Sequence, residues 1–115
     1  MYIANPTQIP PNVFIYTLYP ARLAMLTDGP TDEEKALAGR HWAYSQGLLA
    51  KGIIVFAGRT IDRTEASFAF CVVQTTSEEE GRVIMEDDPA VKGGVFRARL
   101  FPFQPMLIGE WEAQE

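Results

Sequence analysis

The chain has few residues that hold metals or form disulfides. Its 115 residues include one cysteine, Cys71, and one histidine, His41. A single cysteine cannot form a disulfide within the chain, and a lone thiol in an apolar run is typical of a reducing cytosol. No further ligand residues cluster around either one in the sequence. We therefore expect no transition-metal site.

Basic residues and long apolar runs are also scarce. Ten Lys and Arg against fifteen Asp and Glu give a net charge of −5, whereas nucleic-acid binding needs a basic face. No apolar run approaches the ~20 residues that span a bilayer. Residues 1–11 lack the basic and apolar regions of a signal peptide. We expect a cytoplasmic protein that binds neither nucleic acid nor membrane.

The length and composition predict one globular domain over residues 1–115. Hydrophobic residues make up 47% of the chain and charged residues 22%, which is ordinary for a protein with a buried core. The proline-containing residues 1–12 are expected to form an irregular arm. Residues 106–115 are expected to be a carboxy-terminal extension, whose apolar stretch at 106–108 could support assembly beyond a dimer.

The most clearly signalled element is a helix over residues 31–51. Thr31 and Glu34 match a capping box, and Gly52 suits the left-handed residue after a helix. The residues of its buried face would be Leu37, His41, Tyr44 and Leu48. Histidine changes charge near neutral pH, so a histidine on a buried face is a candidate for proton transfer. The alternative is a core histidine whose nitrogens are both hydrogen-bonded.

Four segments rich in β-branched and aromatic residues predict strands. They cover residues 13–19, 53–57, 66–75 and 95–111. A short helical turn is expected at Met25 and Leu26. A second capping box at Ser77 and Glu80 starts a short helix that ends before Pro89, and residues 90–94 are expected to be a loop. The order β-α-β-β-α-β is the ferredoxin-like α+β plan, a four-stranded antiparallel sheet with both helices on one face.

The third strand carries bulky residues on both of its faces. Phe68, Phe70 and Val72 alternate with Ala69, Cys71 and Val73. Helices can cover only one face of the sheet, so the other face needs a second apolar cover. A second copy of the sheet, packed face to face, is the economical cover, and we expect a symmetric homodimer.

Four short motifs occur in order between residues 13 and 107. They are His-Trp-Ala-Tyr at 41–44 followed by Gly52, Ala-Gly-Arg-Thr at 57–60, Asp-Pro-Ala-Val-Lys-Gly-Gly-Val at 88–95, and Leu-Phe-Pro-Phe at 100–103. In order and spacing they resemble the YCII-related (YciI-like) family, small proteins of the dimeric α/β-barrel superfamily. That fold agrees with the topology derived from the strand and helix patterns.

The resemblance implies an active site built from His41 and Asp88. Relatives of the fold include muconolactone isomerases, and one family member is described as a dehydrochlorinase of a chlorinated hydroxyquinol. The resemblance therefore implies a cofactor-free lyase or isomerase that moves a proton on a small aromatic or enolic molecule. Short family members lack a connector as long as residues 21–30, so we expect a different pocket wall here.

The chemistry of the pair can also be stated without the family. A carboxylate beside an imidazole favours the imidazolium and orients the ring, while burial opposes the charge. His41 could then act as a general acid or base, provided that Asp88 lies within hydrogen-bond reach. The alternative function is a small-ligand-binding or accessory dimer of the same fold without catalysis.

Three further residues are candidate substrate contacts. Arg59 could hold an anionic group with its forked donors, or it could pair with Asp62 or Glu65 on the surface. Tyr44 is either a core residue or a substrate contact. Tyr16 is either a sheet residue or a cavity residue with its hydroxyl inward.

Overall fold

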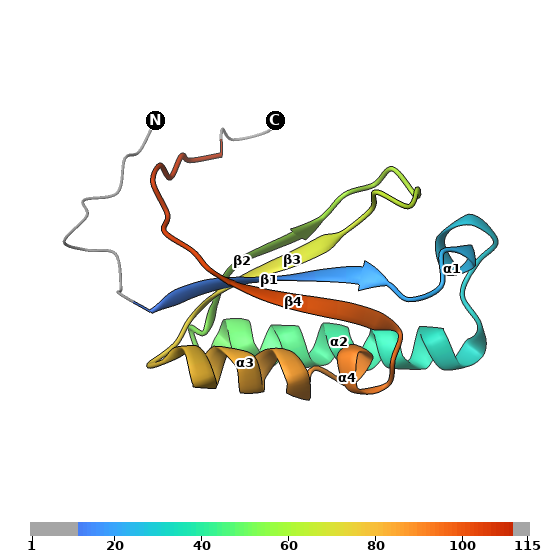
Figure 1. Ribbon diagram of the computed structural model, residues 1–115, viewed down its shortest axis with the longest axis horizontal. Helices are drawn as coiled ribbons and strands as arrows, with labels where there is room; N and C mark the ends of the chain where they lie inside the picture. The colour runs from blue at the N-terminus through green and yellow to red at the C-terminus, as the bar shows by residue number, and fades with distance from the viewer. Residues whose placement is uncertain (1–11, 112–115) are drawn as a thin grey trace.

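The computed structural model describes residues 12–111, which form an antiparallel sheet with helices on one face (Figure 1). In chain order the elements are β1 (Val13–Pro20), α1 (Ala24–Thr27), α2 (Asp32–Ala50), β2 (Ile54–Arg59), β3 (Ala69–Gln74), α3 (Glu78–Asp87), α4 (Pro89–Lys92) and β4 (Phe96–Pro102). The arm expected at residues 1–12 lies outside the described residues except for Asn12, as do residues 112–115 of the expected extension.

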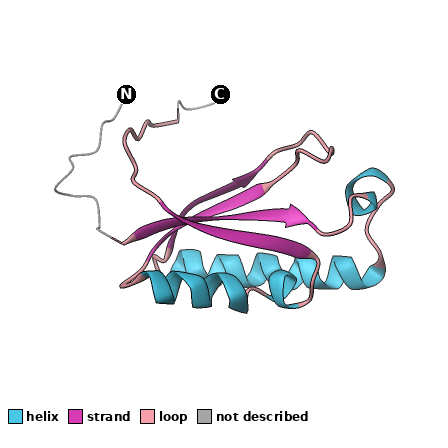
Figure 2. Cartoon of the chain, in the orientation of Figure 1, coloured by secondary structure: helices cyan, strands magenta, loops and turns pink. Residues whose placement is uncertain are grey.

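The strand order is β2-β3-β1-β4, and every neighbouring pair is antiparallel. Strand β1 is therefore central, and the later strands flank it on both sides. Figure 2 shows α2, α3 and α4 together below the sheet, while α1 lies beyond one end of β1. This arrangement confirms the predicted ferredoxin-like α+β plan with a four-stranded antiparallel sheet.

The structure contains one helix that the sequence analysis missed. Residues 90–94 were predicted to be a loop, but α4 occupies most of them. The Asp88 side chain accepts a hydrogen bond from the backbone N–H of Ala90, and Pro89 takes the first helical position. Both are helix-start signals. The prediction was wrong because it used Asp88 and Pro89 only as the end of α3.

The last two strands are shorter than predicted. Strand β3 begins at Ala69 rather than at residue 66, after a turn in which Ser67 N–H bonds to the Thr64 carbonyl. Strand β4 ends at Pro102, and residues 103–111 leave the sheet on the side away from the helices (Figure 1). Proline has no N–H to continue a ladder, which suits the end of a strand.

Helix α2 has the start and the buried face that its sequence predicts. Glu34 N–H bonds to Thr31 Oγ1 at 3.1 Å, and the Glu34 carboxylate accepts from Thr31 N–H at 2.8 Å, which completes the capping box. Leu48 is buried, and Leu37 and Tyr44 pack against the core. The second capping box is only half formed, because the Glu80 side chain bonds to Thr76 instead of Ser77.

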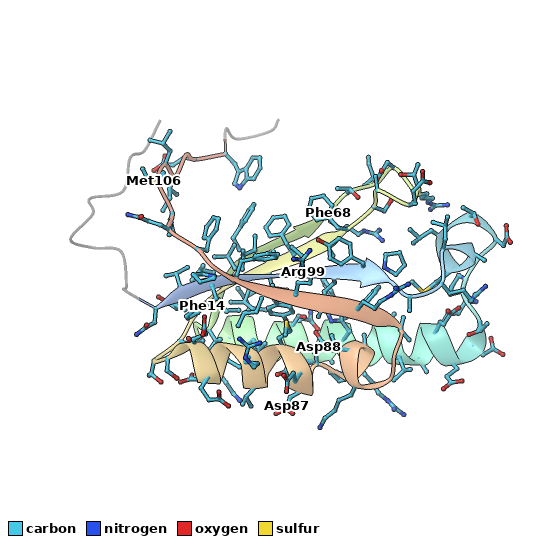
Figure 3. The ribbon with its side chains drawn as sticks, viewed as in Figure 1. Phe14, Phe68, Asp87, Asp88, Arg99 and Met106 are labelled. Carbon is cyan, nitrogen blue, oxygen red and sulfur yellow. The ribbon has the colours of Figure 1, made fainter. Side chains whose placement is uncertain are left out.

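The core fills the space between the sheet and the helices. Its buried members are Phe14, Tyr16, Leu18, Leu48, Ile54, Cys71, Val73, Ile84 and Met85. In Figure 3 Asp88 lies on this helix side of the sheet, whereas Phe68 lies on the other side. Within residues 12–111, no helix is long and apolar enough to cross a membrane, and no group of three or more His, Cys, Asp or Glu side chains is placed to hold a metal ion.

Candidate active site

His41 and Asp88 form a close hydrogen bond beneath the sheet. His41 Nδ1, on α2, lies 2.6 Å from Asp88 Oδ2 at the start of α4. The Asp88 side chain is fully buried, and the His41 side chain is 18% exposed. The neighbouring Asp87 is 52% exposed and pairs with Lys92. The structure therefore brings together the two residues that the sequence analysis paired, and it directs the other aspartate to solvent.

Both oxygens of the Asp88 carboxylate accept hydrogen bonds. Oδ1 accepts from the Ala90 N–H at 3.0 Å, and Oδ2 accepts from the Tyr16 hydroxyl at 3.5 Å as well as from His41. A buried carboxylate is tolerated only when such donors replace water. Strand β1, helix α2 and helix α4 thus all contribute to holding this one side chain.

The pairing leaves one nitrogen of His41 free. An ionised carboxylate can only accept hydrogen bonds, so Nδ1 carries the hydrogen toward Asp88. Within residues 12–111, Nε2 makes no hydrogen bond. The buried side-chain polar atoms without a partner in these residues are Thr17 Oγ1 and Ser45 Oγ, so Nε2 is not one of them. The Phe96 ring meets the His41 ring edge-on, with 5.6 Å between centroids. His41 therefore presents a nitrogen without a hydrogen-bond partner in the described residues, beside an aromatic wall.

The two tyrosines named as candidate substrate contacts have other partners. Tyr16 is completely buried with its hydroxyl at Asp88, and desolvation raises the pKa of this phenol strongly. Tyr44 donates its hydroxyl to the Ile84 carbonyl at 2.7 Å, and partial burial raises its pKa to about 12. Neither side chain lines the cavity described next. In the described chain Tyr16 supports Asp88, and Tyr44 ties α2 to α3.

A cavity of about 760 Å³ lies beside the pair, between the 21–30 connector, α2 and the β2–β3 loop. Arg59 lines it and makes no ion pair with Asp62 or Glu65. Connector residues 25–30 form part of the wall. His41 itself does not line the cavity. Phe96 does, and because its ring also contacts His41, it separates the cavity from the imidazole.

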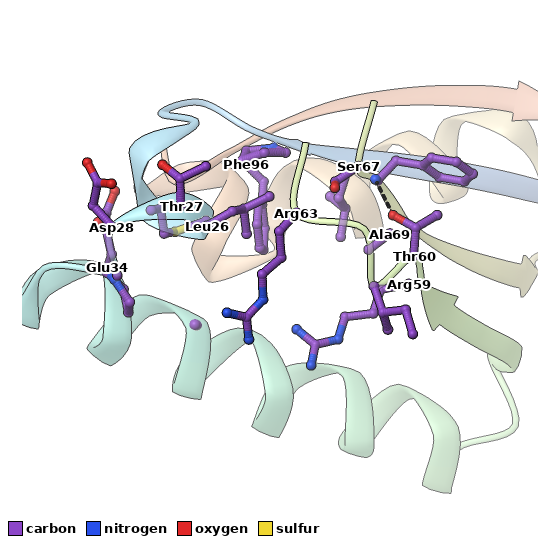
Figure 4. Close-up of a pocket in the computed structure, with 18 of the residues that line it drawn as sticks. Leu26, Thr27, Asp28, Glu34, Arg59, Thr60, Arg63, Ser67, Ala69 and Phe96 are labelled. Carbon is purple, nitrogen blue, oxygen red and sulfur yellow. Dashed lines mark hydrogen bonds between the residues drawn. The ribbon is translucent and has the colours of Figure 1, made fainter. Parts of the chain in front are cut away.

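Sequence reasoning missed two cationic residues of this cavity. Arg63 lies in the polar β2–β3 loop, and Lys35 lies on the first half of α2. Figure 4 shows Arg59 and Arg63 both extending from the β2–β3 segment toward α2. Arg59 and Arg63 are both exposed at the cavity. Neither the spacing nor the hydropathy of residues 59–65 distinguishes an arginine at a cavity from one elsewhere on the surface, so the sequence contains no signal for Arg63.

The family model of the YCII-related domain matches residues 16–104, which include both His41 and Asp88. The chain belongs to the YCII-related family. A comparison with curated protein sequences gives no match. Among solved structures, this YCII-related domain is similar to 5-chloro-2-hydroxyhydroquinone dehydrochlorinase from Burkholderia phenoliruptrix AC1100, determined in complex with 2,5-dihydroxybenzoquinone. The TM-score is 0.57 at 20% identity, over 79% of this chain and 93% of that chain. At this identity the likeness shows the fold alone.

Proposed function

We propose that this YCII-related protein is a cofactor-independent enzyme of the lyase or isomerase type, in which His41 moves a proton on a small aromatic or enolic molecule. The observation that carries the proposal is the His41–Asp88 pair, with 2.6 Å between Nδ1 and Oδ2 and with Nε2 free. A general base needs a fixed tautomer and a free nitrogen within reach of substrate. The dehydrochlorinase that shares the fold supports this reaction class.

In the proposed mechanism Nε2 of His41 removes a proton from a carbon next to a carbonyl or enol. Asp88 stabilises the imidazolium that results, because its carboxylate is already in contact with Nδ1. The imidazolium then returns the proton to another atom of the same molecule in an isomerisation. In an elimination the electron pair of the broken C–H bond instead expels an anionic leaving group. Tyr16 positions Asp88, and Arg59 holds an anionic part of the substrate.

The alternative is a small-ligand-binding or accessory protein that does no chemistry. The observation in its favour is that Phe96 stands between His41 and the cavity, so His41 does not line the space in which a ligand would lie. In that case the cavity holds the ligand and the His41–Asp88 pair only stabilises the contact between α2 and α4.

Screening dienelactones, hydroxyquinols and chlorinated catechols in D₂O separates the two functions. Turnover or deuterium incorporation at carbon is expected for the wild type, with a loss of at least about 100-fold in His41→Ala, the usual contribution of a general base. Asp88→Asn keeps a helix-capping side chain but loses the charge, and we expect a similar loss. Asp87→Asn is the matched control and should behave as wild type. Equal turnover by wild type and His41→Ala would remove His41 from catalysis, whereas no turnover and no deuterium incorporation by wild type would favour the binding protein.

We also propose that two copies associate through the sheet face that the helices leave uncovered. On that face Phe56 lies opposite Val72, and Ile15 lies opposite both Val72 and Phe101. Phe56 is 49% exposed. The Arg99 guanidinium lies over the Phe101 ring, 5.1 Å from its centroid. The row of apolar side chains that starts at Phe56 therefore ends beside a positive charge at Phe101. A continuous apolar row on one face is a typical surface for symmetric packing of two sheets.

A further inference from the structure

The cavity beside His41 is cationic although the protein as a whole is acidic. Its lining includes Arg59, Arg63 and Lys35, against two carboxylates, Asp28 and Glu34. The whole chain carries a net charge of −5. Cationic groups gathered in a concave site of an acidic protein attract anionic ligands to that site.

Two carboxylates around the cavity, Glu34 and Asp62, bond to other groups. Glu34 accepts two hydrogen bonds from the Arg22 guanidinium, at 2.6 and 3.1 Å. Asp62, which adjoins Arg63 in the chain, accepts from the hydroxyls of Thr64 and Ser67 at 2.7 and 2.8 Å. Figure 4 shows Glu34 and Asp28 at the end of the cavity near α1, away from both arginine head groups. Within residues 12–111, Arg59 and Arg63 form no ion pair.

The β2–β3 loop holds Arg63 in a defined backbone conformation. Arg63 has φ of +54°, the one non-glycine residue with positive φ in the described chain. Such a conformation is unfavourable for a long side chain and persists only where the surroundings impose it. The hydroxyl bonds to Asp62, together with the Thr64 N–H to Ser67 Oγ bond at 2.9 Å, provide that restraint.

An apolar wall completes the site. Leu18, Met25, Leu26 and Phe96 line the same cavity as the arginines. Phe96 contacts His41, so a ring packed on this wall would extend from the arginines toward the imidazole. Guanidinium groups bind planar carboxylates through two parallel hydrogen bonds, and they do so more specifically than lysine.

We propose that Arg59 and Arg63 together form a carboxylate-binding site, and that the ligand of this cavity is a small aromatic or enolic acid. The inference rests on the proposed function, because this acid is the molecule whose proton His41 moves. It goes further by naming the acidic group as the part that is recognised. A neutral phenol of the same shape would lack that anchor.

The test compares two probes that differ only in the carboxylate, 2,5-dihydroxybenzoate and hydroquinone, by calorimetric titration at low salt. Wild type is expected to bind the acid at least about tenfold more tightly, equivalent to about 1.4 kcal/mol. Arg63→Gln and Arg59→Gln should each abolish most of this preference while leaving hydroquinone binding unchanged. Arg82→Gln, which removes an exposed arginine on α3 away from the cavity, is the matched control and should retain it.

Several results would overturn the site. These are equal binding of the two probes by wild type, no saturable binding of the acid, a full preference in both glutamine variants, or tighter binding of inorganic phosphate than of the acid. Circular dichroism checks the fold of each variant, and Arg63→Lys, which keeps the charge but not the fork, should retain only part of the preference. His41→Ala should bind the acid as wild type does. Acid preference without any turnover would refute the proposed catalysis alone, whereas turnover of neutral phenols without acid preference would refute this site alone.

Discussion

Leu37 on α2 lies directly against Gly93, the residue that ends α4. A Cβ atom at position 93 would lie 2.6 Å from Cδ1 and 2.9 Å from Cδ2 of Leu37. His41 follows Leu37 by one helical turn, and Asp88 begins the helix that Gly93 ends. The missing side chain at position 93 therefore allows α2 and α4 to approach closely enough for the His41–Asp88 hydrogen bond.

Gly93→Ala should both destabilise the protein and impair its site. The backbone of Gly93 has φ of −79°, which alanine adopts freely, so the effect comes from the contact with Leu37 and not from backbone strain. Overpacking of this kind costs about 1–3 kcal/mol. We expect a lower urea midpoint, together with a loss of any turnover that depends on His41.

Gly39→Ala is the matched control for this substitution. Gly39 lies in α2, and a Cβ atom at this position would have no side chain or neighbouring element within 4 Å. Alanine favours a helix by up to about 1 kcal/mol over glycine. Gly39→Ala should therefore raise the urea midpoint and leave turnover unchanged. Similar midpoints for the two variants would show that Leu37 does not confine position 93.

Tyr44→Phe distinguishes a structural tyrosine from a substrate contact. The hydroxyl of Tyr44 donates to the Ile84 carbonyl, and the loss of such a bond costs about 0.5–1.5 kcal/mol. We expect a decrease of that size in the free energy of unfolding, measured in urea, with kcat/KM close to wild type. A large drop in kcat/KM at unchanged stability would instead make Tyr44 a substrate contact.

Acid should weaken the contact between the connector and α2. The hydrogen bond from Arg22 lowers the pKa of Glu34 from its usual 4.5 to about 2. Because the pKa in the folded state lies below the unfolded value, this carboxylate contributes stability that is fully present above pH 4.5 and is lost as the pH falls through about 2. The Tm of wild type should fall more steeply between about pH 5 and pH 2 than that of Glu34→Gln. Parallel curves of Tm against pH for the two proteins would show that Glu34 does not contribute this stability.

Phe56→Lys should prevent association through the uncovered sheet face. The substitution places a charge at the β2 end of the apolar row that Phe56 forms with Val72 and Ile15. Sedimentation at micromolar concentration should show a dimer for wild type and a monomer for the variant. Val83→Lys alters an equally exposed apolar residue on α3 and should remain dimeric. A monomeric wild type would rule out the proposed dimer.

The sequence predicts most of the arrangement that places His41 beside Asp88. Apolar periodicity assigns His41 to the buried face of α2, and the capping residues Thr31 and Glu34 locate the start of that helix. The element order β-α-β-β-α-β predicts the ferredoxin-like plan of the sheet and helices. These signals are local or periodic, so they can be recognised in the sequence without knowing the tertiary contacts.

The partners of individual polar atoms are not predictable in the same way. Periodicity places Tyr44 on the buried face of α2, whereas Tyr16 could be a sheet residue or a cavity residue. Neither pattern says where the hydroxyl bonds, and the structure directs Tyr16 to Asp88 and Tyr44 to Ile84. The position of Arg63 at the cavity depends on a loop conformation fixed by side-chain hydroxyls. Helix α4 has four residues, too few for a periodic signal, although Asp88 and Pro89 do carry its start.

The two outer strands of the sheet bear on how copies of the protein can associate. In the described sheet, β2 and β4 are the edges. The register of β2 shifts between Ile54 and Phe56, and β4 has two exposed arginines and ends at Pro102. Irregularities, charges and prolines oppose backbone pairing between edges. Growth into filaments by strand addition is thus disfavoured, and copies that meet through the apolar face form a closed pair with no free surface of the same kind for a third.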